Sequence, residues 1–279
     1  MGLLGGKVAL VAGAGPGLGR DVALAFAREG ATVVVAARTA DKVEALAAEI
    51  ADSAPSAGSA AITDAAEAAA AVTAVGLRLD VTDADSCRGV VDEVVDRFGR
   101  LDVLVNNAFD DGDHTAFLDA DLDRWRRTMD VNFFGTMQLT QAAARPMVAQ
   151  GDGRIVMINS MSAVRMRPRF GAYTASKAAL GAITKILAAE LGEHGVRVNG
   201  VHPGYIWGDS VEMYFAHLAG KKGITPEEQY AEVASDTALG YLPHSSEIAE
   251  AVVFFASDMS KPVTGQALGV NAGQWFQGF

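Results

Sequence analysis

The sequence predicts an α/β protein in which helices cover both faces of one parallel β-sheet. Short apolar runs with the character of buried strands alternate with segments of helical periodicity along the chain, and this alternation is typical of such a layered fold. A glycine-rich turn joins the first apolar run to the first helical segment. Because ligands of such sheets bind at the carboxyl ends of the strands, we expect the polar motifs to meet at that edge.

Seven apolar runs are expected to form the strands. A chain of 279 residues that is 50% hydrophobic can bury one sizeable core, so residues 1–279 are interpreted as a single domain. The Ala/Ser-rich stretch 51–73 predicts an extended helix and a surface loop, because alanine favours helix; a functional element is the alternative. The expected strands are 7–12, 32–37, 75–80, 103–106, 154–160, 197–202 and 266–271.

The glycine-rich turn follows the first strand and precedes a helical pattern that runs up to Gly30. In this setting, missing side chains let backbone N–H groups approach a pyrophosphate at the positive end of a helix. A glycine-rich stretch alone is weak evidence, but its place between a strand and a helix strengthens it. The residues expected to bind the dinucleotide here are Gly13, Gly15, Pro16, Gly17, Leu18 and Gly19.

Ser160, Tyr173 and Lys177 form the second motif, at the end of the fifth expected strand and in the helix that follows. In a helix, Tyr173 and Lys177 lie one turn apart on one face, where the ammonium is expected to lower the phenol's pKa. A phenol titrates near ~10 when unperturbed, which is too high for efficient acid–base catalysis at neutral pH. The motif therefore predicts a proton donor.

Taken in order, the motifs resemble the short-chain dehydrogenase/reductase family over nearly the whole chain. The resemblance implies a Rossmann-type, doubly wound sheet and an NAD(P)-dependent oxidoreductase that transfers hydride between nicotinamide and a ketone or secondary alcohol. The matching residues are Gly13, Gly17 and Gly19, with Ala12 in place of the usual Thr; Asn106-Asn107-Ala108; Asn132; Ser160, Tyr173 and Lys177; Arg197-Val198-Asn199 with Pro203-Gly204; Thr264-Gly265-Gln266; and Val270-Asn271-Ala272-Gly273.

The resemblance implies a role for each catalytic residue. Tyr173 exchanges a proton with the substrate oxygen, and Ser160 polarises that oxygen. Lys177 lowers the Tyr pKa and holds the nicotinamide ribose, while Asn132 positions a water in the proton relay. Further residues implied to contact the cofactor, besides Tyr173, Lys177 and the glycine turn, are Arg38, Thr39, Asp80, Val81, Asn107, Ala108, Pro203, Gly204 and Ile206. Asp80 could instead cap a helix.

Arg38 decides the expected choice between NADP and NAD. A carboxylate at the end of the second strand would bind the adenine ribose of NAD, whereas a basic residue accommodates the 2′-phosphate of NADP. Ala37 occupies the position of that carboxylate and Arg38 follows it, so we predict a preference for NADP(H), with NAD(H) possible. Against this, the basic residue that many NADP-dependent members carry in the glycine turn is missing, and Arg38 could be a solvated loop residue.

Three features depart from the family pattern. Phe109 replaces a glycine near the cofactor cleft, where it could shape the substrate wall or fill core. Gly208 replaces a Thr that often binds the nicotinamide carboxamide, so that contact could pass to the Ile206 backbone or to Ser210. Basic residues alternate near the expected substrate entrance, where they could attract an anionic substrate; ordinary surface ion pairing is the alternative that we favour. They are Arg165, Arg167 and Arg169.

The segment from about 205 to 242 is expected to cover the substrate, as the corresponding region does in the family. Its aromatic and Met residues, among them Trp207 and Met213, suggest a fairly large apolar ketone or secondary alcohol, although such a stripe could equally pack against the body of the domain. A 3-oxoacyl thioester reductase is the alternative enzyme, with the arginines binding an acidic carrier. The alternative of another class is a non-catalytic dinucleotide-binding regulator.

Composition restricts the partners further. The net charge of -11 argues against nucleic acid or an anionic membrane as a partner, and we predict no metal site. The single cysteine, Cys87, excludes an intramolecular disulfide and suits a reducing compartment. With no signal segment or membrane span recognised, we expect a cytoplasmic protein. The resemblance implies a homotetramer or homodimer in which the long helix from about 121 to 150 and the helix that carries Tyr173 and continues through Leu187 pair with the same helices of another copy. We expect the tail 273–279 near a second interface, because its aromatic residues would otherwise be exposed.

Overall fold

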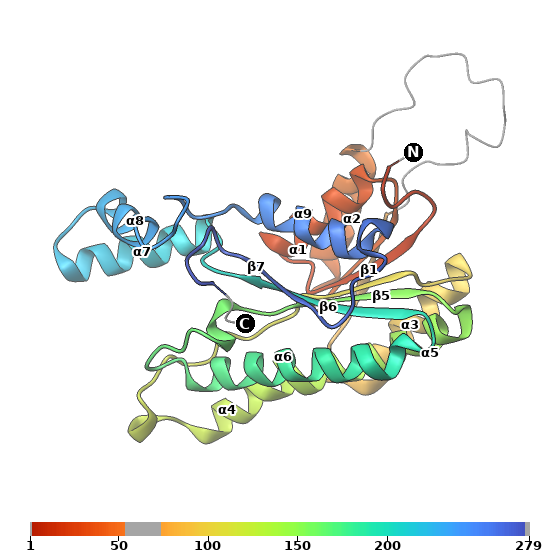
Figure 1. The fold of residues 1–279 in the computed structure, drawn as a ribbon, viewed down its shortest axis with the longest axis horizontal. Helices are drawn as coiled ribbons and strands as arrows, with labels where there is room; N and C mark the ends of the chain where they lie inside the picture. Colours follow the sequence, from red (N-terminus) through yellow and green to blue (C-terminus); the bar gives the residue numbers. More distant parts are fainter. Residues whose placement is uncertain (1, 54–73, 277–279) are drawn as a thin grey trace, which may run out of the picture.

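The structure, a computed structural model, describes residues 2–53 and 74–276. Figure 1 shows a sheet with helices packed on both sides and two helices, α7 and α8, beyond one end of it. The seven strands run parallel in the order β3-β2-β1-β4-β5-β6-β7, so the strand order reverses between β1 and β4. This is the predicted α/β Rossmann-type fold. The strands are β1 Val8–Ala12, β2 Thr32–Ala37, β3 Ala74–Arg78, β4 Val103–Asn106, β5 Gly153–Ile158, β6 Val196–Pro203 and β7 Ala267–Val270.

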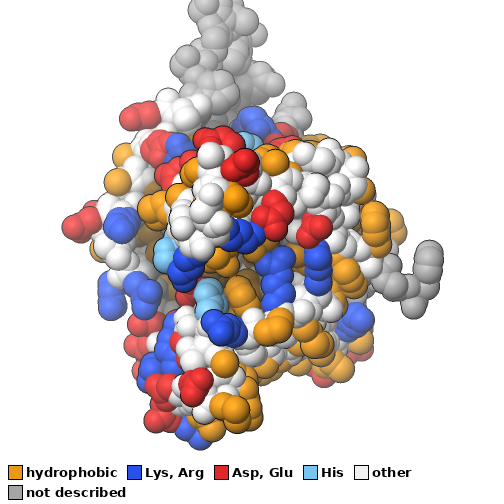
Figure 2. Space-filling view, turned by 90° about the vertical axis from the view of Figure 1, so that its left-hand side faces the viewer, with side chains coloured by type: hydrophobic (Ala, Val, Ile, Leu, Met, Phe, Trp, Pro, Cys, Tyr) orange, Lys and Arg blue, Asp and Glu red, His pale blue; other side chains and the backbone are white. Residues whose placement is uncertain are grey.

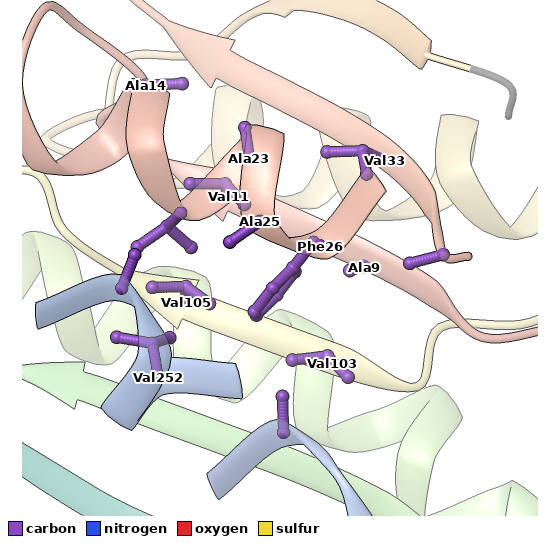
Figure 3. Close-up of a cluster of buried hydrophobic side chains, with 14 of the residues drawn as sticks. Ala9, Val11, Ala14, Ala23, Ala25, Phe26, Val33, Val103, Val105 and Val252 are labelled. Atoms are coloured by element: carbon purple, nitrogen blue, oxygen red, sulfur yellow. The ribbon is translucent and has the colours of Figure 1, made fainter. Parts of the chain in front are cut away.

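Alternate residues of the central strands enter two separate hydrophobic layers. Val11 on β1 and Val35 on β2 pack beneath α1, α2 and α9, and Figure 3 shows Phe26 of α1 and Val252 of α9 directed into this layer. Leu10 and Val34 point to the opposite layer, beneath α3, α5 and α6. Because both faces are covered, the central strands contain continuous apolar runs, as parallel strands do.

The helices alternate with the strands, as the periodicity predicts. They are α1 Leu18–Arg28, α2 Ala40–Ser53, α3 Ala84–Phe98, α4 Leu122–Met129, α5 Thr136–Gln150, α6 Gly171–Gly192, α7 Asp209–Lys222, α8 Pro226–Ala234 and α9 Ser245–Ala256. α2 ends at Ser53, the edge of the described residues, and the rest of the extended helix and surface loop predicted for 51–73 lies outside them. Short 3₁₀ turns follow Ala116, Ser160 and Ser257.

The long helix expected at 121–150 contains an irregular segment. Asp121 caps α4 by accepting from the Asp123 N–H at 2.9 Å. Between α4 and α5 the chain forms a π-helical segment, Asp130–Gly135 (η2). A Cβ on Gly135 would lie 2.8 Å from Val81 Cγ2, so only glycine allows this close approach. The segment contains Asn132, and π segments are frequent at functional sites.

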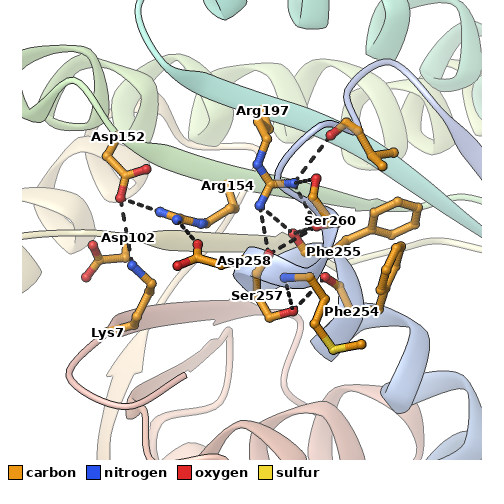
Figure 4. A network of polar contacts seen from close by, with 12 residues as sticks. Lys7, Asp102, Asp152, Arg154, Arg197, Phe254, Phe255, Ser257, Asp258 and Ser260 are labelled. Carbon is orange, nitrogen blue, oxygen red and sulfur yellow. Dashed lines mark hydrogen bonds and ion pairs between the residues drawn. The ribbon is translucent and has the colours of Figure 1, made fainter. Parts of the chain in front are cut away.

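Arginines join the amino ends of β5 and β6 to the end of α9, at the edge of the sheet opposite the polar motifs (Figure 4). Arg154 pairs with Asp152 and, at 2.6 Å, with Asp258. Arg197 donates to the Ser260 hydroxyl at 2.8 Å and to the Ser257 carbonyl at 2.9 Å. These contacts satisfy carbonyls that the end of α9 leaves unpaired. Arg197, part of a family-like motif, is therefore a structural residue here.

Candidate active site

The glycine-rich turn places two kinds of glycine between β1 and α1. A Cβ on Gly13 would lie 2.4 Å from the Ala108 N, and one on Gly19 would lie 2.4 Å from the Gly13 carbonyl oxygen. These two glycines are required by packing. A Cβ on Gly15 or Gly17 would meet nothing within 4 Å, so that side of the turn is open.

The start of α1 leaves its N–H groups available to an anion. Gly17 is the N-cap and makes no side-chain capping bond. Asn107, at the end of β4, supports the turn by donating from Nδ2 to the Gly13 carbonyl at 2.8 Å. Asn107 and the half-buried Ala108 thus border the point where the strand order reverses, which is where ligands bind in such sheets.

Ser160 and Tyr173 lie within hydrogen-bond reach of each other. Ser160 follows β5, and its hydroxyl also accepts from the Ser162 N–H at 3.1 Å. Desolvation raises the pKa of the half-buried Tyr173 above 10.0, with the Asp111 charge acting in the same direction, while the hydrogen bond with Ser160 opposes them. Removal from water therefore sets the direction of this shift, and the expectation that Lys177 lowers the pKa of Tyr173 stays a prediction.

Lys177 lies one turn after Tyr173, as predicted, but its ammonium is bound to the backbone. Nζ donates to the Ile158 carbonyl at 2.8 Å and lies 5.8 Å from the centroid of the Tyr173 ring. Only 3% of the residue is exposed, and burial lowers the pKa of Lys177 from 10.5 to about 8. The side chain therefore lies behind the tyrosine instead of pairing with an acid.

Asn132 is fully buried, and its side-chain amide is bound by protein groups. Oδ1 accepts from the Asp110 N–H at 2.7 Å, and Nδ2 donates to the Asp110 carbonyl at 2.8 Å and to Ser176 Oγ at 2.9 Å. These bonds join the loop after β4 to α6. The side chain anchors this junction, and its predicted role in positioning a water stays a prediction.

Arg38 and Asp80 lie at the ends of β2 and β3. Arg38 and Thr39 are exposed. Asp80 Oδ1 accepts from the Thr82 hydroxyl at 2.7 Å and from the Thr82 N–H at 3.0 Å, and these bonds, together with the Arg38 charge, lower the pKa of Asp80. Asp80 forms a turn instead of a helix cap, because Asp83 caps α3. Val81 is buried next to it.

The end of β6 carries Pro203, Gly204 and Ile206 toward the same edge. Gly208 is the N-cap of α7 with a φ angle of +155°, a conformation that favours glycine, and Ser210 is exposed. A Cβ on Gly204 would lie 3.0 Å from Gln274 Oε1, so the chain after β7 closes over this strand end. Both polar atoms of the Gln274 amide are buried without a partner in the described structure.

Each of the three arginines near the expected entrance has a different environment. Arg165 pairs with Asp236 at 3.6 Å and donates to the Gln274 carbonyl at 3.1 Å. Arg167 lies over the Tyr205 ring, 4.9 Å from its centroid. Arg169 is exposed and, within the described residues, forms no ion pair. Surface ion pairing thus explains Arg165 alone. Figure 2 shows several Lys and Arg side chains across the middle of this end, with hydrophobic side chains between them.

The aromatic side chains of the segment 205–242 form a small core of their own. Phe215 is fully buried and contacts Tyr205 and Trp207, with ring centroids 5.4 and 5.8 Å apart. Trp207 also packs edge-on against Tyr230. The alternative named from the sequence was packing against the body of the domain, whereas these rings pack on one another within the segment. Met213, which is 70% exposed, and Tyr214 remain on the surface.

Sequence reasoning missed several polar residues that lie close to Asn132 or Lys177. Asp110 and Arg124 pair at 2.5 Å next to Asn132, and His202 is buried at the end of β6, where burial and the charges of Lys177 and Lys185 lower its pKa to about 4. No local motif marks these residues, because their partners come from distant segments. The acidic run 110–113 was the one visible signal.

The residues at this edge fit a nicotinamide dinucleotide. The open side of the glycine turn and the uncapped start of α1 suit a pyrophosphate. Arg38 lies where the adenosine end of such a ligand is bound, and Ser160, Tyr173 and Lys177 lie beyond the strand-order reversal. The fold and the site together define a dinucleotide-dependent oxidoreductase.

Comparisons with known proteins agree with this class. A family model described as "Enoyl-(Acyl carrier protein) reductase" matches residues 13–274. The chain is 33% identical to 3-oxoacyl-(acyl-carrier-protein) reductase FabG of Thermotoga maritima over 97% of its length and 98% of that protein. It is 34% identical to galactitol 2-dehydrogenase of Agrobacterium fabrum, over 98% of each chain.

Solved structures share the fold over almost the whole chain. An NAD+-bound xylitol dehydrogenase is 29% identical and superimposes with a TM-score of 0.84, covering 96% of this chain and 98% of that one. A short-chain dehydrogenase/reductase from Mycobacterium marinum is 33% identical, with a TM-score of 0.80 over 98% and 97% of the two chains.

The chain belongs to the short-chain dehydrogenase/reductase family, the NAD(P)-dependent oxidoreductases. It is a dehydrogenase/reductase that acts on CH–OH groups. The prediction of an enzyme is confirmed, and the alternative of a non-catalytic regulator is not supported. No helix in the described ranges is long and apolar enough to cross a membrane.

Proposed function

We propose that the protein is an NADP(H)-dependent carbonyl reductase or alcohol dehydrogenase in which Tyr173 is the proton donor and acceptor. The observation that carries this proposal is the grouping of Ser160, Tyr173 and Lys177 beside the strand-order reversal. Tyr173 is half-buried and within reach of Ser160, so a substrate oxygen that replaces the hydroxyl–phenol contact can be bound by both groups.

Each side chain then has one task. The bound dinucleotide supplies or accepts the hydride. Tyr173 gives its proton to the carbonyl oxygen, or takes one from the alcohol in the reverse direction. Ser160 donates a hydrogen bond to the same oxygen and stabilises the negative charge that develops there. Lys177 holds the nicotinamide ribose and presents a positive charge behind the phenol, and Asn132 keeps the loop after β4 against α6.

Arg38 supports the preference for NADP(H). It is exposed at the end of β2, directly after Ala37, so no carboxylate occupies the position that would bind the adenine ribose. Asp80, whose pKa the Arg38 charge helps to lower, is already bound by Thr82. A guanidinium at this place can pair with a 2′-phosphate through two parallel hydrogen bonds. NAD(H) is the second possibility, and a structural relative is NAD+-bound.

We further propose that the segment 205–242, within a single domain, covers a fairly large apolar substrate. Exposed apolar side chains support this: Phe109, which directly follows Ala108, is 61% exposed, and Met213 in α7 is 70% exposed. Since Trp207 and Phe215 pack within the segment, the proposal rests on these exposed residues and on Met166.

A 3-oxoacyl thioester is the second candidate substrate. The relative from Thermotoga maritima bears that activity in its name. In this chain, Arg167 and Arg169 follow Ser160 on the same loop, and neither is paired with an acid in the part of the chain that the structure describes. They could attract a phosphate or the acidic carrier of such a substrate.

A substrate panel followed with NADPH and NADH side by side tests these proposals. It should contain a bicyclic ketone such as tetralone, the acetoacetyl thioester of N-acetylcysteamine, xylitol and galactitol. We expect the apolar ketone to be reduced with the highest kcat/KM and NADPH to be preferred. Preferential use of the thioester would support the second candidate, and turnover of the polyols alone would contradict both.

The small-molecule substrate is the only partner proposed besides further copies of the chain, as a homotetramer or homodimer. The cytoplasmic location, expected because the single cysteine suits a reducing compartment and because no signal segment or membrane span was recognised, stays a prediction. Cys87 is buried, and burial raises the pKa of its thiol to about 11, so the thiol is unreactive at neutral pH.

A further inference from the structure

A continuous chain of hydrogen bonds runs from the side of α4 to the backbone of Tyr173. Arg124 Nη2 donates to Asp110 Oδ1 at 2.5 Å. The backbone of Asp110 is held on both sides by Asn132, at 2.7 and 2.8 Å. Asn132 donates to Ser176 Oγ at 2.9 Å, and Ser176 in turn donates to the Tyr173 carbonyl at 2.7 Å. Segments distant in the sequence are thereby joined behind the proton donor.

Arg124 and Asp110 together fix the loop that follows β4. The Asp110 carboxylate also accepts from the Gly112 N–H at 2.8 Å and from Thr128 Oγ1 at 3.1 Å. Arg124 donates to the Gly112 carbonyl at 3.2 Å and to Thr128 Oγ1 at 3.0 Å. The loop is therefore held through both its acid and its backbone.

This loop lies directly against the first turn of α6. A Cβ on Gly112 would lie 3.8 Å from Ala172 Cβ and 3.9 Å from the Tyr173 N. The φ angle of Gly112 is +82°, a conformation that glycine adopts without strain. The loop therefore lies beside the turn that carries Tyr173 and leaves room for about one methyl group between them, so its position depends on the bonds that Arg124 and Asp110 make.

The pair differs from the other ion pairs of the same helix. The side chains of Arg124 and Asp110 are 23% and 25% exposed, whereas those of Arg126 and Asp123, also paired on α4, are 71% and 73% exposed. Exposed pairs contribute little to stability. Removing one partner of the half-buried pair leaves a shielded charge and frees the loop.

We propose that Arg124 and Asp110 are a positioning pair for catalysis, which holds Tyr173 in place through Asn132 and Ser176. The inference rests on the proposed role of Tyr173 as proton donor. Arg124 does not reach the reacting atoms; it acts by fixing the loop that Asn132 joins to the first turns of α6. A displacement of about 1 Å at a proton donor can cost up to about 100-fold in rate, so a pair outside the site can control turnover.

Three variants of the full-length protein test the pair. Arg124→Met removes the charge and the hydrogen bonds, Arg124→Lys keeps the charge, and Asp110→Asn keeps the shape of the acid. Arg126→Met is the matched control on the same helix. For each, kcat and KM are measured with the fastest substrate of the panel, together with the dissociation constant of NADPH and the melting temperature.

We expect Arg124→Met and Asp110→Asn to lower kcat at least about tenfold while the NADPH dissociation constant changes less than about threefold. Arg124→Lys should recover part of the rate. The double variant that combines Arg124→Met with Asp110→Asn should be no slower than the slower of these two single variants, because both changes break the same contact. Arg126→Met should have the wild-type kcat. If Arg124→Met does not fold, Asp110→Asn and Arg124→Lys provide the same test.

A kcat within twofold of the wild type for both Arg124→Met and Asp110→Asn would overturn the inference, and so would losses that simply multiply in the double variant. An equal loss in Arg126→Met would also overturn it, since it would show a general effect of charge on α4. The two proposals can be told apart: an inactive Tyr173→Phe with an unaffected Arg124→Met leaves the function standing and removes only the positioning pair, whereas an active Tyr173→Phe removes the proposed proton donor itself.

Discussion

Tyr173 combines a phenol within reach of Ser160 with an environment that disfavours phenolate. Replacing Tyr173 by Phe removes the transferable proton and keeps the ring, so we expect turnover to fall by at least about 100-fold, the lower end of what general acid–base catalysis supplies. NADPH affinity, measured by fluorescence titration, should change little. Near-normal turnover of this variant would show that another group moves the proton.

The direction of the Tyr173 pKa shift predicts the pH dependence. Because desolvation raises this pKa above 10.0, the phenol is protonated at neutral pH and ready for carbonyl reduction. Alcohol oxidation needs the deprotonated form, whose population increases tenfold per pH unit below the pKa. We expect kcat/KM for oxidation to rise steadily to about pH 9 or beyond, while kcat/KM for reduction stays level from about pH 6 to 9. An oxidation plateau below pH 8 would contradict this.

Lys177 makes a stability prediction of opposite sign to that of a paired lysine, whose pKa an acid would raise. Its pKa is about 8 in the folded protein and 10.5 when unperturbed, so between these values the unfolded chain binds the extra proton and stability rises with pH. Relative to Lys177→Met, the wild type should gain about 3 kcal/mol between pH 7 and 10.5. Urea unfolding of both proteins at the two pH values measures this difference. The other titrating groups are common to both proteins, so a constant difference would refute the low pKa.

Arg38 should separate the two cofactors. Replacement by Ala removes the only basic side chain proposed to meet the 2′-phosphate, so NADPH should bind much more weakly while NADH binding is nearly unchanged. Dissociation constants for both cofactors, measured on the same preparation, provide the comparison. Equal losses would show that Arg38 does not discriminate between them.

At the scale of elements, different glycines of the turn serve packing and ligand binding. Gly19→Ala would place a methyl group 2.4 Å from the Gly13 carbonyl oxygen, and overpacking of this kind costs about 1–3 kcal/mol. In Gly15→Ala the methyl meets nothing within 4 Å, so the fold should keep its stability while the dinucleotide, which approaches from that side, binds more weakly. Urea unfolding and NADPH titration distinguish the two; a destabilised Gly15→Ala would contradict the assignment.

The helix from α4 to α5 shows how an element is shaped by its neighbours. A single helix at 121–150 was predicted, and its ends, Asp121 and Gln150, agree with the structure. The π-helical segment η2 was not predicted, because it depends on the contact between Gly135 and Val81. That contact forms only once β3 and the long helix are packed together.

At the scale of the whole molecule, several large apolar side chains remain on helices. Ile186 in α6 is 52% exposed, and Leu122 in α4 is 53% exposed. The expected pairing of α4–α5 and α6 with the same helices of a second copy would cover them. Of the tail thought to lie near a second interface, Trp275 is half-buried and Phe276 is 73% exposed, while Phe279 is outside the described residues.

Light scattering tests the predicted homotetramer. A mass near 29.0 kDa would refute any stable oligomer, and a dimer mass would leave only the helix-pair interface. If the helices pair, Ile186→Glu should reduce the mass by placing a charge in the interface. Met259, which is exposed in the 3₁₀ turn that follows α9, provides the control: Met259→Glu should leave the mass unchanged.

Local patterns determined much of this protein in advance. Strand positions, the glycine turn, the helix that carries Tyr173 and Lys177, and the edge where the motifs meet all follow from hydrophobic periodicity and residue spacing, because those features act over a few neighbouring residues. The predicted strand ends differ from those in the structure by one or two residues, as at β3 and β5, because hydrogen bonding to a neighbouring strand determines where a strand ends. The family resemblance added the roles of Ser160 and Asn132.

Only the tertiary structure decided what surrounds those residues. The sequence places Lys177 one turn from Tyr173, but the depth of burial, which sets the direction of both pKa shifts, depends on how α6 packs on β5 and β6. The sequence also shows aromatic residues in the segment 205–242, yet their contact with one another depends on how α7 and α8 pack together. The bond between Arg124 and Asp110 joins residues that no local rule relates. Desolvation and contacts between distant segments arise when the chain packs, so their energies cannot be read from neighbouring residues in the sequence.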